Sequence, residues 1–167
     1  MATETKLIKY LNQILKNTYD GIKSYRDAAR NVEEGEIREF FIDRAKEKLV
    51  LKDAIKEEIY RLEGLPVEEG SLMNLFSRSW KNFKTSLDHD NEKEIAKYCL
   101  EEEKKRVDEY GILLRNPELV SETFFKVLNT QNEKNLVAIK ALIDRVKSWF
   151  YPPYRPTLFT WNTQILA

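Results

Sequence analysis

The chain has few of the residues that break helices or that carry common catalytic chemistry. Its 167 residues include five glycines, five prolines, one cysteine and one histidine. The single cysteine, Cys99, excludes a disulfide within the chain and is typical of a protein from a reducing compartment. No nucleophile–base arrangement, glycine-rich phosphate loop or cysteine-rich metal motif is present. We therefore predict a cytoplasmic protein that is not an enzyme, with no catalytic residues and no cofactor.

Charge and hydropathy exclude two further classes of partner. Lysine plus arginine number 28, as do aspartate plus glutamate, so the formal net charge is zero. No overall field exists to attract nucleic acid or an anionic membrane. No apolar run approaches the ~20 residues of a membrane-spanning helix, and the polar N-terminus lacks the apolar run of a signal peptide. We expect a soluble protein with no nucleic-acid and no membrane partner.

Apolar residues recur at three- and four-residue spacing over most of the chain, which predicts an all-α fold. The second helix should end at Gly64-Leu65-Pro66, where glycine permits a left-handed cap and proline cannot continue the helix. Asn116-Pro117-Glu118 is a typical N-cap and first turn for the last helix. This helix either continues to residue 150 or is interrupted by the polar run 129–132. The predicted helices cover about residues 5–30, 33–63, 72–87, 91–115 and 117–150.

Helix lengths predict a four-helix bundle with one short extra helix before the third long one. A rise of 1.5 Å per residue makes four helices roughly 37 to 51 Å long and the helix at 72–87 only about 24 Å. If the segment after residue 63 crosses the bundle, the third long helix runs parallel to the second. The alternative is an up-down-up-down bundle in which 72–87 and 91–115 form one kinked helix. We predict a helical domain, residues 1–150, and an extended C-terminal tail, residues 151–167.

Ionisable residues interrupt two of the predicted apolar stripes. One stripe is Phe41, Arg44, Lys48, Leu51 and Ile55, and the other is Ile95, Cys99, Glu102, Arg106 and Tyr110. Because burying a charge without a partner is costly, these charges are predicted to face one another inside the bundle. The alternative is that the long side chains reach solvent along the bundle surface. A buried pairing would fix the register of the helices more than it would stabilise them.

Short strings in a fixed order carry a family resemblance over roughly residues 5 to 148. They are Leu11-Asn12, Asp20-Gly21, Tyr25, Ala28-Ala29, Phe40-Phe41, Ala45, Gly64, Pro66, Gly70-Ser71, Arg78, Trp80, Lys84, Gln131 and Lys134. Together they resemble an uncharacterised bacterial family of ferritin-like four-helix-bundle proteins, catalogued as a domain of unknown function. The resemblance implies a ferritin-like bundle and brings no established activity with it.

The ferritin and rubrerythrin group, which this family resembles in fold, binds two metal ions with glutamates and Glu-x-x-His pairs from its four helices. Set against that pattern, Thr18 replaces the glutamate of the first helix. Lys48 and Leu51 occupy the likely glutamate and histidine positions of the second helix. The only histidine, His89, falls in a predicted break between helices. The comparison therefore predicts no conventional metal site.

The resemblance leaves one or two polar residues per helix where metal ligands would be. We predict that they form a metal-free interior polar layer of Thr18, Arg44, Lys48, Glu102, Glu103 and Gln131. The alternative is an atypical carboxylate site for iron or another divalent metal around Glu102, Glu103 and Gln131.

The tail has an unusual composition for an exposed segment. Residues 157–166 carry no charge and are rich in β-branched and aromatic types, a composition that promotes aggregation when exposed. We therefore predict that the tail either folds back over its own bundle or docks on another subunit as an assembly arm. The residues predicted to make these contacts are Trp149, Phe150, Tyr151, Tyr154, Leu158, Phe159, Trp161, Ile165 and Leu166.

These observations favour a non-enzymatic bacterial protein that acts as a homo-oligomer or through a protein partner. The family resemblance suggests a role in stress physiology. A second hypothesis is a metal-binding or oxidase-type relative of the ferritins that uses the atypical carboxylate site.

Overall fold

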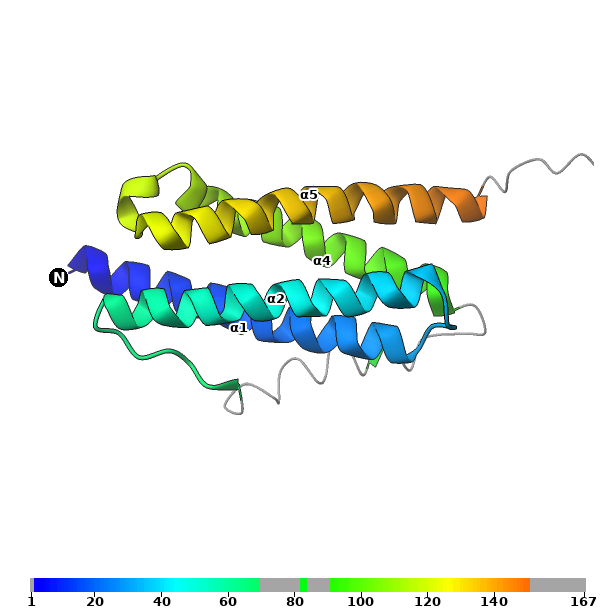
Figure 1. Cartoon of the computed structure of the whole chain (residues 1–167), viewed down its shortest axis with the longest axis horizontal. Helices are drawn as coiled ribbons and strands as arrows, with labels where there is room; N and C mark the ends of the chain where they lie inside the picture. Colours follow the sequence, from blue (N-terminus) through cyan, green and yellow to red (C-terminus); the bar gives the residue numbers. More distant parts are fainter. Residues whose placement is uncertain (1, 70–81, 84–90, 151–167) are drawn as a thin grey trace, which may run out of the picture.

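The computed structural model describes residues 2–69, 82–83 and 91–150. Its elements are α1 (Ala2–Arg30), α2 (Glu36–Arg61), α4 (Asn91–Leu114), the short 3-10 helix η2 (Pro117–Leu119) and α5 (Glu122–Phe150). The four long helices lie side by side as an elongated bundle (Figure 1). The predicted all-α fold of four long helices is confirmed. The predicted helix 72–87, apart from residues 82–83, and the tail 151–167 lie outside the described residues.

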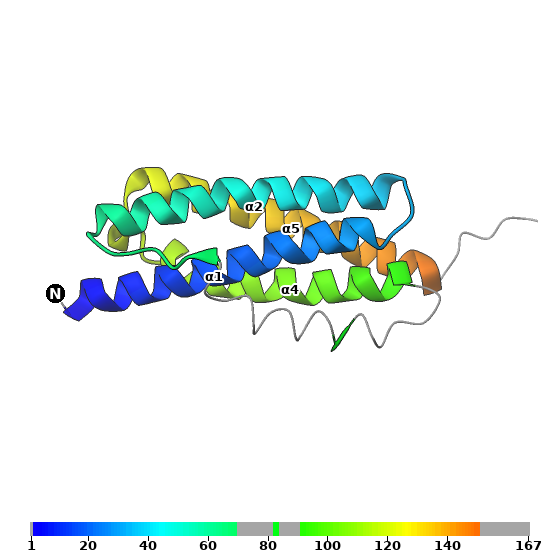
Figure 2. The ribbon, with the colours of Figure 1, turned by 90° about the horizontal axis from the view of Figure 1, so that it is seen from below.

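Neighbouring helices in the bundle run antiparallel, whereas α2 and α4 lie diagonally across its axis. α1 and α5 each pack against both α2 and α4. Figures 1 and 2 show α1 and α5 running in one direction and α2 and α4 in the other. Because α2 and α4 run in the same direction, the up-down-up-down alternative is wrong, and the described helices have the directions that the predicted crossover requires. This topology makes α2 and α4 a parallel, diagonal pair.

The end of α2 differs in detail from the prediction. The left-handed residue is Glu63, with a φ of 58°, and not Gly64. Glu63 N donates to Tyr60 O and Gly64 N donates to Ile59 O, both at 2.9 Å, which are the two hydrogen bonds of a Schellman cap. Gly64 serves close packing instead, because a Cβ there would lie 2.9 Å from Cγ2 of Ile8 and 3.0 Å from Cγ2 of Ile59.

The last helix begins later than predicted. Pro117 opens only the short η2 turn, and α5 begins at Glu122. Ser121 is its N-cap, because Ser121 Oγ accepts a hydrogen bond from Phe124 N at 3.2 Å. From there α5 is one continuous helix, so the interruption at 129–132 does not occur.

Glu58 of α2 fixes the position of this helix start. Its Oε2 accepts a hydrogen bond from Ser121 Oγ at 2.6 Å, and its Oε1 accepts one from Ser121 N at 2.8 Å. Arg61 Nη2 donates to the same carboxylate at 2.7 Å. Burial opposes ionisation of Glu58, but the hydrogen bonds from Arg61 and Ser121 outweigh it and lower the pKa. A carboxylate therefore faces the positive end of the α5 dipole, which stabilises the helix.

The segment after α2 is tied to α1 by Asn12. Asn12 Nδ2 donates to Leu65 O at 3.0 Å, and Asn12 Oδ1 accepts from Val67 N at 2.8 Å. Tyr19 OH donates to Val67 O at 3.4 Å. One amide side chain thus satisfies two backbone groups of the crossover where it leaves α2.

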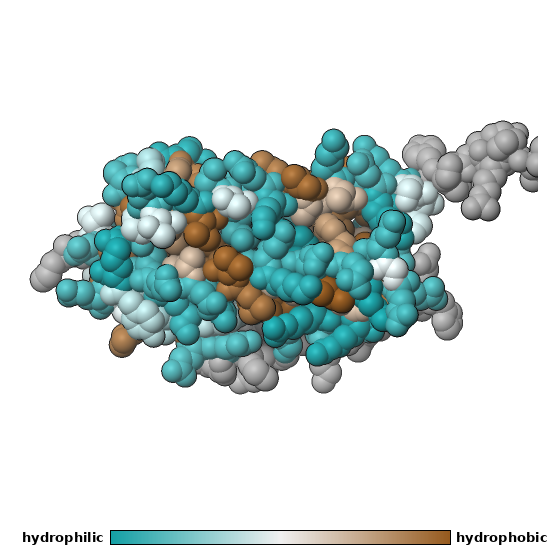
Figure 3. Space-filling view, in the orientation of Figure 1, coloured by the Kyte–Doolittle hydropathy of each residue, from teal (hydrophilic) through white to brown (hydrophobic). Residues whose placement is uncertain are grey.

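The described surface is largely hydrophilic, with hydrophobic side chains gathered in patches on the face shown in Figure 3. The exposed large hydrophobic residues are Val50, Tyr60, Leu65, Ile112, Leu136 and Val137. No helix within residues 2–69, 82–83 and 91–150 is long and apolar enough to cross a membrane.

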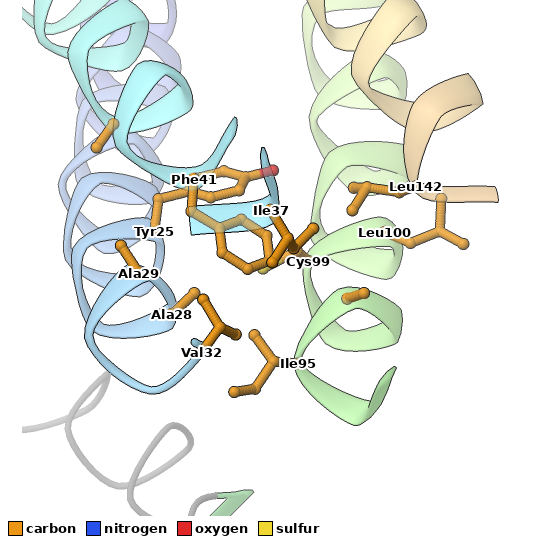
Figure 4. Packing of buried hydrophobic residues seen from close by; sticks show 12 residues of the cluster. Tyr25, Ala28, Ala29, Val32, Ile37, Phe41, Ile95, Cys99, Leu100 and Leu142 are labelled. Carbon is orange, nitrogen blue, oxygen red and sulfur yellow. The ribbon is translucent and has the colours of Figure 1, made fainter. Parts of the chain in front are cut away.

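Two apolar clusters fill the bundle, one toward each end. The cluster nearer the α1–α2 turn includes Tyr25, Val32, Phe41, Ile95 and Leu142 (Figure 4). The other includes Leu15, Ile55, Tyr110, Leu113 and Leu128. Near the boundary between the two clusters lie the buried polar residues Thr18, Arg44, Lys48, Glu103, Gln131 and Asn135. This polar layer divides the core and contains the candidate site.

Candidate functional site

Glu103 of α4 is the centre of a buried ionic cluster. Its side chain is 1% exposed, and its Oε1 lies 3.0 Å from Lys48 Nζ and 3.2 Å from Arg44 Nη2. The hydroxyl of Tyr25 donates to the same oxygen at 2.6 Å. Two cations from α2 and a phenol from α1 therefore converge on one carboxylate oxygen near the bundle axis.

Arg44 extends this cluster to α5. Its Nη2 donates to Asn135 Oδ1, and its Nη1 donates to Glu47. Each of the four long helices thus contributes at least one side chain. The charges of Arg44 and Lys48 face those of Glu47 and Glu103, and these four charges sum to zero. Because the buried charges are paired, the cost of removing them from water is partly offset.

The mutual arrangement of these groups fixes their protonation states. Burial opposes ionisation of Glu103, but Lys48 and Arg44 outweigh it and lower the pKa of the carboxyl from 4.5 to about 2. Burial and the Glu103 charge raise the pKa of Tyr25 well above 10.0. Burial also lowers the pKa of Lys48, against the attraction of Glu103. At neutral pH, Glu103 is therefore an anion and Tyr25 is a neutral donor.

The aromatic ring of Tyr25 also contacts both cations. Lys48 Nζ lies 5.5 Å from the ring centroid and Arg44 Cζ lies 5.9 Å from it. These distances are within the range of cation–π attraction. Tyr25 thus stabilises the anion through its hydroxyl and the cations through its ring.

The structure brings together three of the residues predicted for the interior layer, namely Arg44, Lys48 and Glu103. Thr18 is buried at the same level, but its Oγ1 donates to Ile14 O at 2.8 Å within its own helix. Gln131 is buried on α5, one turn before Asn135. In the described part of the chain, the side chains that pair with the carboxylate of Glu103 are Tyr25, Arg44 and Lys48, and not these two.

Glu102 lies outside the interior layer, and this part of the prediction is wrong. Its side chain is 33% exposed and pairs with Lys105 at 2.7 Å and Arg106 at 3.4 Å. At 100° per residue, the fourth residue after buried Cys99 lies closer to its face than the third does. Glu103 therefore points into the bundle and Glu102 toward its surface.

Tyr25 and Asn135 are cluster members that the predicted layer did not include. On α1, the side chain that contacts Glu103 is Tyr25. The prediction had named Thr18, which lies two helical turns before Tyr25. A signal for it exists in the sequence, because a phenol in a predicted core stripe needs a hydrogen-bond partner. Asn135 follows Gln131 by four residues, so both lie on one face of α5.

A second polar network joins α1 to α4 beside the cluster. Asn17 Nδ2 donates to Glu109 Oε1, and Arg106 Nη1 lies 3.0 Å from Glu109 Oε2. Tyr10 OH donates to the backbone carbonyl of Glu109. Burial raises the pKa of Glu109, against the attraction of Arg106. Arg106, predicted to interrupt the interior stripe, therefore pairs at the α1–α4 boundary and not with Glu103.

A cavity of about 20 Å³ lies beside the cluster, and Gly21, Lys48, Cys99 and Glu103 are among its lining residues. This is about the volume that one water molecule needs. Glu103 Oε2 has no hydrogen-bond partner in the described part of the chain. Burial raises the pKa of Cys99, so at neutral pH the residue is a thiol and not a nucleophilic thiolate. The cavity has room for solvent and not for a substrate.

The donors at the bundle centre do not fit a pair of metal ions. Iron sites of this kind need several carboxylate and imidazole ligands, whereas the cluster turns one carboxylate inward, Glu103, beside two cations. Those cations would repel a metal ion. In residues 2–69, 82–83 and 91–150, no three histidine, cysteine, aspartate or glutamate side chains are grouped so that they could hold a metal. His89 lies outside these ranges.

Comparison with known proteins decides the family. Residues 6–116 match the family described as Domain of unknown function (DUF2383). The chain belongs to this family. Membership confirms the resemblance found in the sequence, and the description of the DUF2383 family assigns it no activity. No curated protein matches this DUF2383 chain.

A solved structure shows the fold of this DUF2383 protein. It is described as a dodecameric thioferritin, the bacterioferritin-related protein from Bacteroides fragilis. The match has a TM-score of 0.69 and 15% sequence identity, and it covers 91% of this chain and 92% of that chain. At this identity the likeness concerns the fold alone. The predicted ferritin-like four-helix bundle is confirmed.

Proposed function

We propose that this DUF2383 protein is a non-enzymatic helical bundle that acts through self-association, and that its ionic cluster replaces a ferritin-like metal site. The observation that carries the proposal is the buried pair of Lys48 and Glu103, whose charged atoms lie 3.0 Å apart. In ferritin-like bundles, side chains of facing helices hold metal in the core. Here a cation that belongs to the chain lies between the helices instead.

The cluster serves this function by specifying one packing of the helices. Desolvation offsets much of the attraction in a buried ion pair, so the net gain in stability is small. A shift of α4 by one turn would nevertheless bring Cys99 or Val107 to the position of Glu103 and leave buried Lys48 without its carboxylate. Buried polar groups are known to set helix register in this way. A bundle with a single register presents a constant outer surface for association.

Self-association has two lines of support. The structurally similar protein from Bacteroides fragilis is described as dodecameric. On this chain, Val50 and Tyr60 of α2 are each 58% exposed and Ile112 of α4 is 46% exposed, and apolar surface residues of this kind contribute to protein interfaces. The alternative within this proposal is that a different protein binds to the same surfaces. A cytoplasmic location and a role in stress physiology remain predictions from the sequence.

Light scattering coupled to gel filtration tests the self-association of the full chain. We expect a mass that is a whole multiple of the chain mass and that holds over a tenfold range of protein concentration. The mass of one chain at every concentration would overturn self-association and leave a separate protein partner as the remaining form of the proposal.

Metal analysis of the same sample tests the replacement of the metal site. After dialysis against a chelator, we expect iron, manganese and zinc each to be far below one ion per chain. Stoichiometric metal that survives dialysis, and that is lost in Glu102→Ala or Glu103→Ala, would overturn the proposal in favour of a carboxylate metal site.

A further inference from the structure

The two carboxylate oxygens of Glu103 have very different surroundings. Tyr25, Arg44 and Lys48 all converge on Oε1. Oε2 is buried, and among the described residues it has no hydrogen-bond partner. The whole Glu103 side chain is 1% exposed, so bulk solvent does not supply the missing donor. An oxygen of this kind normally has a partner in a native protein, because a buried acceptor without a donor is destabilising.

The cavity beside Glu103 has the size for one small donor. Its volume is about 20 Å³, whereas a single water molecule requires roughly 10–15 Å³ and a molecule of several heavy atoms requires far more. Gly21 and Ser24 of α1, Lys48 of α2, and Cys99 and Glu103 of α4 are among its lining residues. Glu103, whose second oxygen lacks a donor, therefore lines a space in which a donor of the size of water fits.

The more exposed polar residues of the lining, Asn17, Glu102 and Arg106, are bonded to other groups. Asn17 Nδ2 donates to Glu109, and Asn17 Oδ1 accepts from Gln13 Nε2 at 3.1 Å. Arg106 Nη1 lies 3.0 Å from Glu109 Oε2, and Arg106 Nη2 lies 3.4 Å from Glu102 Oε2. These side chains therefore compete little for a molecule in the cavity.

Two inner residues of the lining have hydrogen-bonding capacity to spare. An ammonium carries three N–H donors, and within the described part of the chain Lys48 Nζ pairs with one acceptor, Glu103 Oε1, at 3.0 Å. Ser24 Oγ donates to Asp20 O at 2.9 Å, which leaves the lone pairs of this oxygen free to accept. The cavity is thus lined by a donor from α2 and by acceptors from α1 and α4.

We propose that one resident water molecule occupies this cavity and completes the ionic cluster. The water donates hydrogen bonds to Glu103 Oε2 and Ser24 Oγ, and it accepts one from Lys48 Nζ. About three hydrogen bonds are typical of a buried water. The lining carries two cationic and two anionic side chains, so its charges sum to zero and a neutral molecule fits better than an ion.

The water links α1, α2 and α4 at one point, because its three partners come from these three helices. It also joins Lys48 to Glu103 a second time, through the carboxylate oxygen that the direct ion pair does not use. The site is independent of the proposed function, since all of its residues belong to one chain and do not require self-association.

A high-resolution crystal structure of the full chain tests the site directly. We expect a water about 2.6 to 3.2 Å from Glu103 Oε2 that is also within hydrogen-bonding distance of Ser24 Oγ and Lys48 Nζ. Asn135 Nδ2 is buried and has no partner in the described part of the chain, so a direct bond from it to Glu103 Oε2 is the competing arrangement. That bond, or a cavity without electron density, would overturn the inference.

Magnetic relaxation dispersion of water oxygen-17 counts long-lived internal waters in solution and gives a second test. Cys99→Val fills the cavity, because it adds roughly the volume of one water while the three polar partners stay in place. Cys99→Ala is the matched control, since it enlarges the cavity and keeps the same partners. We expect Cys99→Val to hold one long-lived water fewer per chain than the wild type, and Cys99→Ala to hold no fewer.

Equal counts in the wild type, Cys99→Val and Cys99→Ala would overturn the inference. Circular dichroism checks that both variants fold, and the crystal structure of the wild type decides the question if Cys99→Val does not. Light scattering of the same samples keeps the result separate from the question of self-association.

Discussion

Lys48 of α2 lies directly against Gly21 of α1. A Cβ on residue 21 would be 2.9 Å from Lys48 Cδ and 3.2 Å from Lys48 Cε. The lysine side chain can therefore reach Glu103 along a path where α1 has no side chain. Glycine inside a helix lowers the stability of the helix by roughly 1 kcal/mol relative to alanine. Burial of the Lys48 cation therefore comes with a less stable α1.

Gly21→Ala should destabilise the protein by about 1–2 kcal/mol, because displacement of the buried lysine outweighs the gain in helix propensity. In a Lys48→Ala background the same substitution should stabilise it by about 1 kcal/mol, since the obstruction is gone. Urea unfolding of the four proteins in this double-mutant cycle measures the coupling. Equal effects of Gly21→Ala in both backgrounds would show that the contact has no energetic consequence.

Lys48→Ala should cost about 3–5 kcal/mol of unfolding free energy, because it leaves Glu103 beside only one buried cation. Lys46→Ala is the matched control on the same helix. Lys46 pairs with Asp43 at 3.2 Å, but both side chains are mostly exposed, so its loss should change stability by less than about 0.5 kcal/mol. An unchanged melting temperature of Lys48→Ala would contradict the buried pairing.

Stability should fall on acidification through the titration of Glu103. Its pKa is about 2 in the folded protein, against an ordinary value of 4.5. Between these values the unfolded chain binds more protons, so the unfolding free energy decreases as the pH falls from about 4.5 to about 2. The loss from this group should be of the order of 3 kcal/mol.

Unfolding at a series of pH values between 5.5 and 2.5 measures this loss. Glu103→Gln removes the titrating group and should flatten the profile, although its stability at pH 5.5 is lower. Glu101→Gln, at an exposed position on the same helix, should leave the profile unchanged. Identical slopes for the wild type and Glu103→Gln would assign the acid sensitivity to other groups.

Ser121→Ala should destabilise the protein by about 1 kcal/mol, because it removes the N-cap of α5 and one hydrogen bond to Glu58. Glu58→Ala should cost at least as much, since it leaves Ser121 N without its acceptor. Glu57→Ala, which changes an exposed neighbour, is the control and should stay within about 0.5 kcal/mol. Thermal unfolding, monitored by circular dichroism, measures the change in stability of each of the three variants. A loss in Glu57→Ala as large as that in Glu58→Ala would refute this role of the carboxylate.

Helix positions were predictable because local signals agree with the fold. Apolar spacing placed the four long helices, and the short length of the segment at 72–87 pointed to the crossover that makes α2 and α4 parallel. The start of α5 was not predictable in the same way, since Asn116-Pro117 and Ser121 are both good N-cap signals. Ser121 is the N-cap of α5 because its backbone N and its hydroxyl both donate hydrogen bonds to Glu58. This contact joins residues that are far apart in the chain.

The sequence predicted a buried polar cluster, but it identified only some of the residues that form the cluster. The interrupted stripes led to Arg44, Lys48 and the acidic pair at 102–103, but two adjacent glutamates differ by one helical step. The predicted stripe took Glu102, three residues after Cys99, because spacings of three and four residues both fit an apolar stripe, although 100° per residue favours Glu103. Tyr25 was overlooked for a different reason, because a phenol in a core stripe indicates that its hydroxyl has a hydrogen-bond partner but does not identify that partner as Glu103.

The buried cluster is built wholly from side chains of one polypeptide. Each copy therefore leaves the ribosome with Arg44, Lys48, Glu47 and Glu103 in a fixed ratio, so these four charges need no loading step after synthesis. If the cluster replaces a metal site as we propose, a cell starved of iron and a cell rich in iron would fold the same bundle around the same four charges.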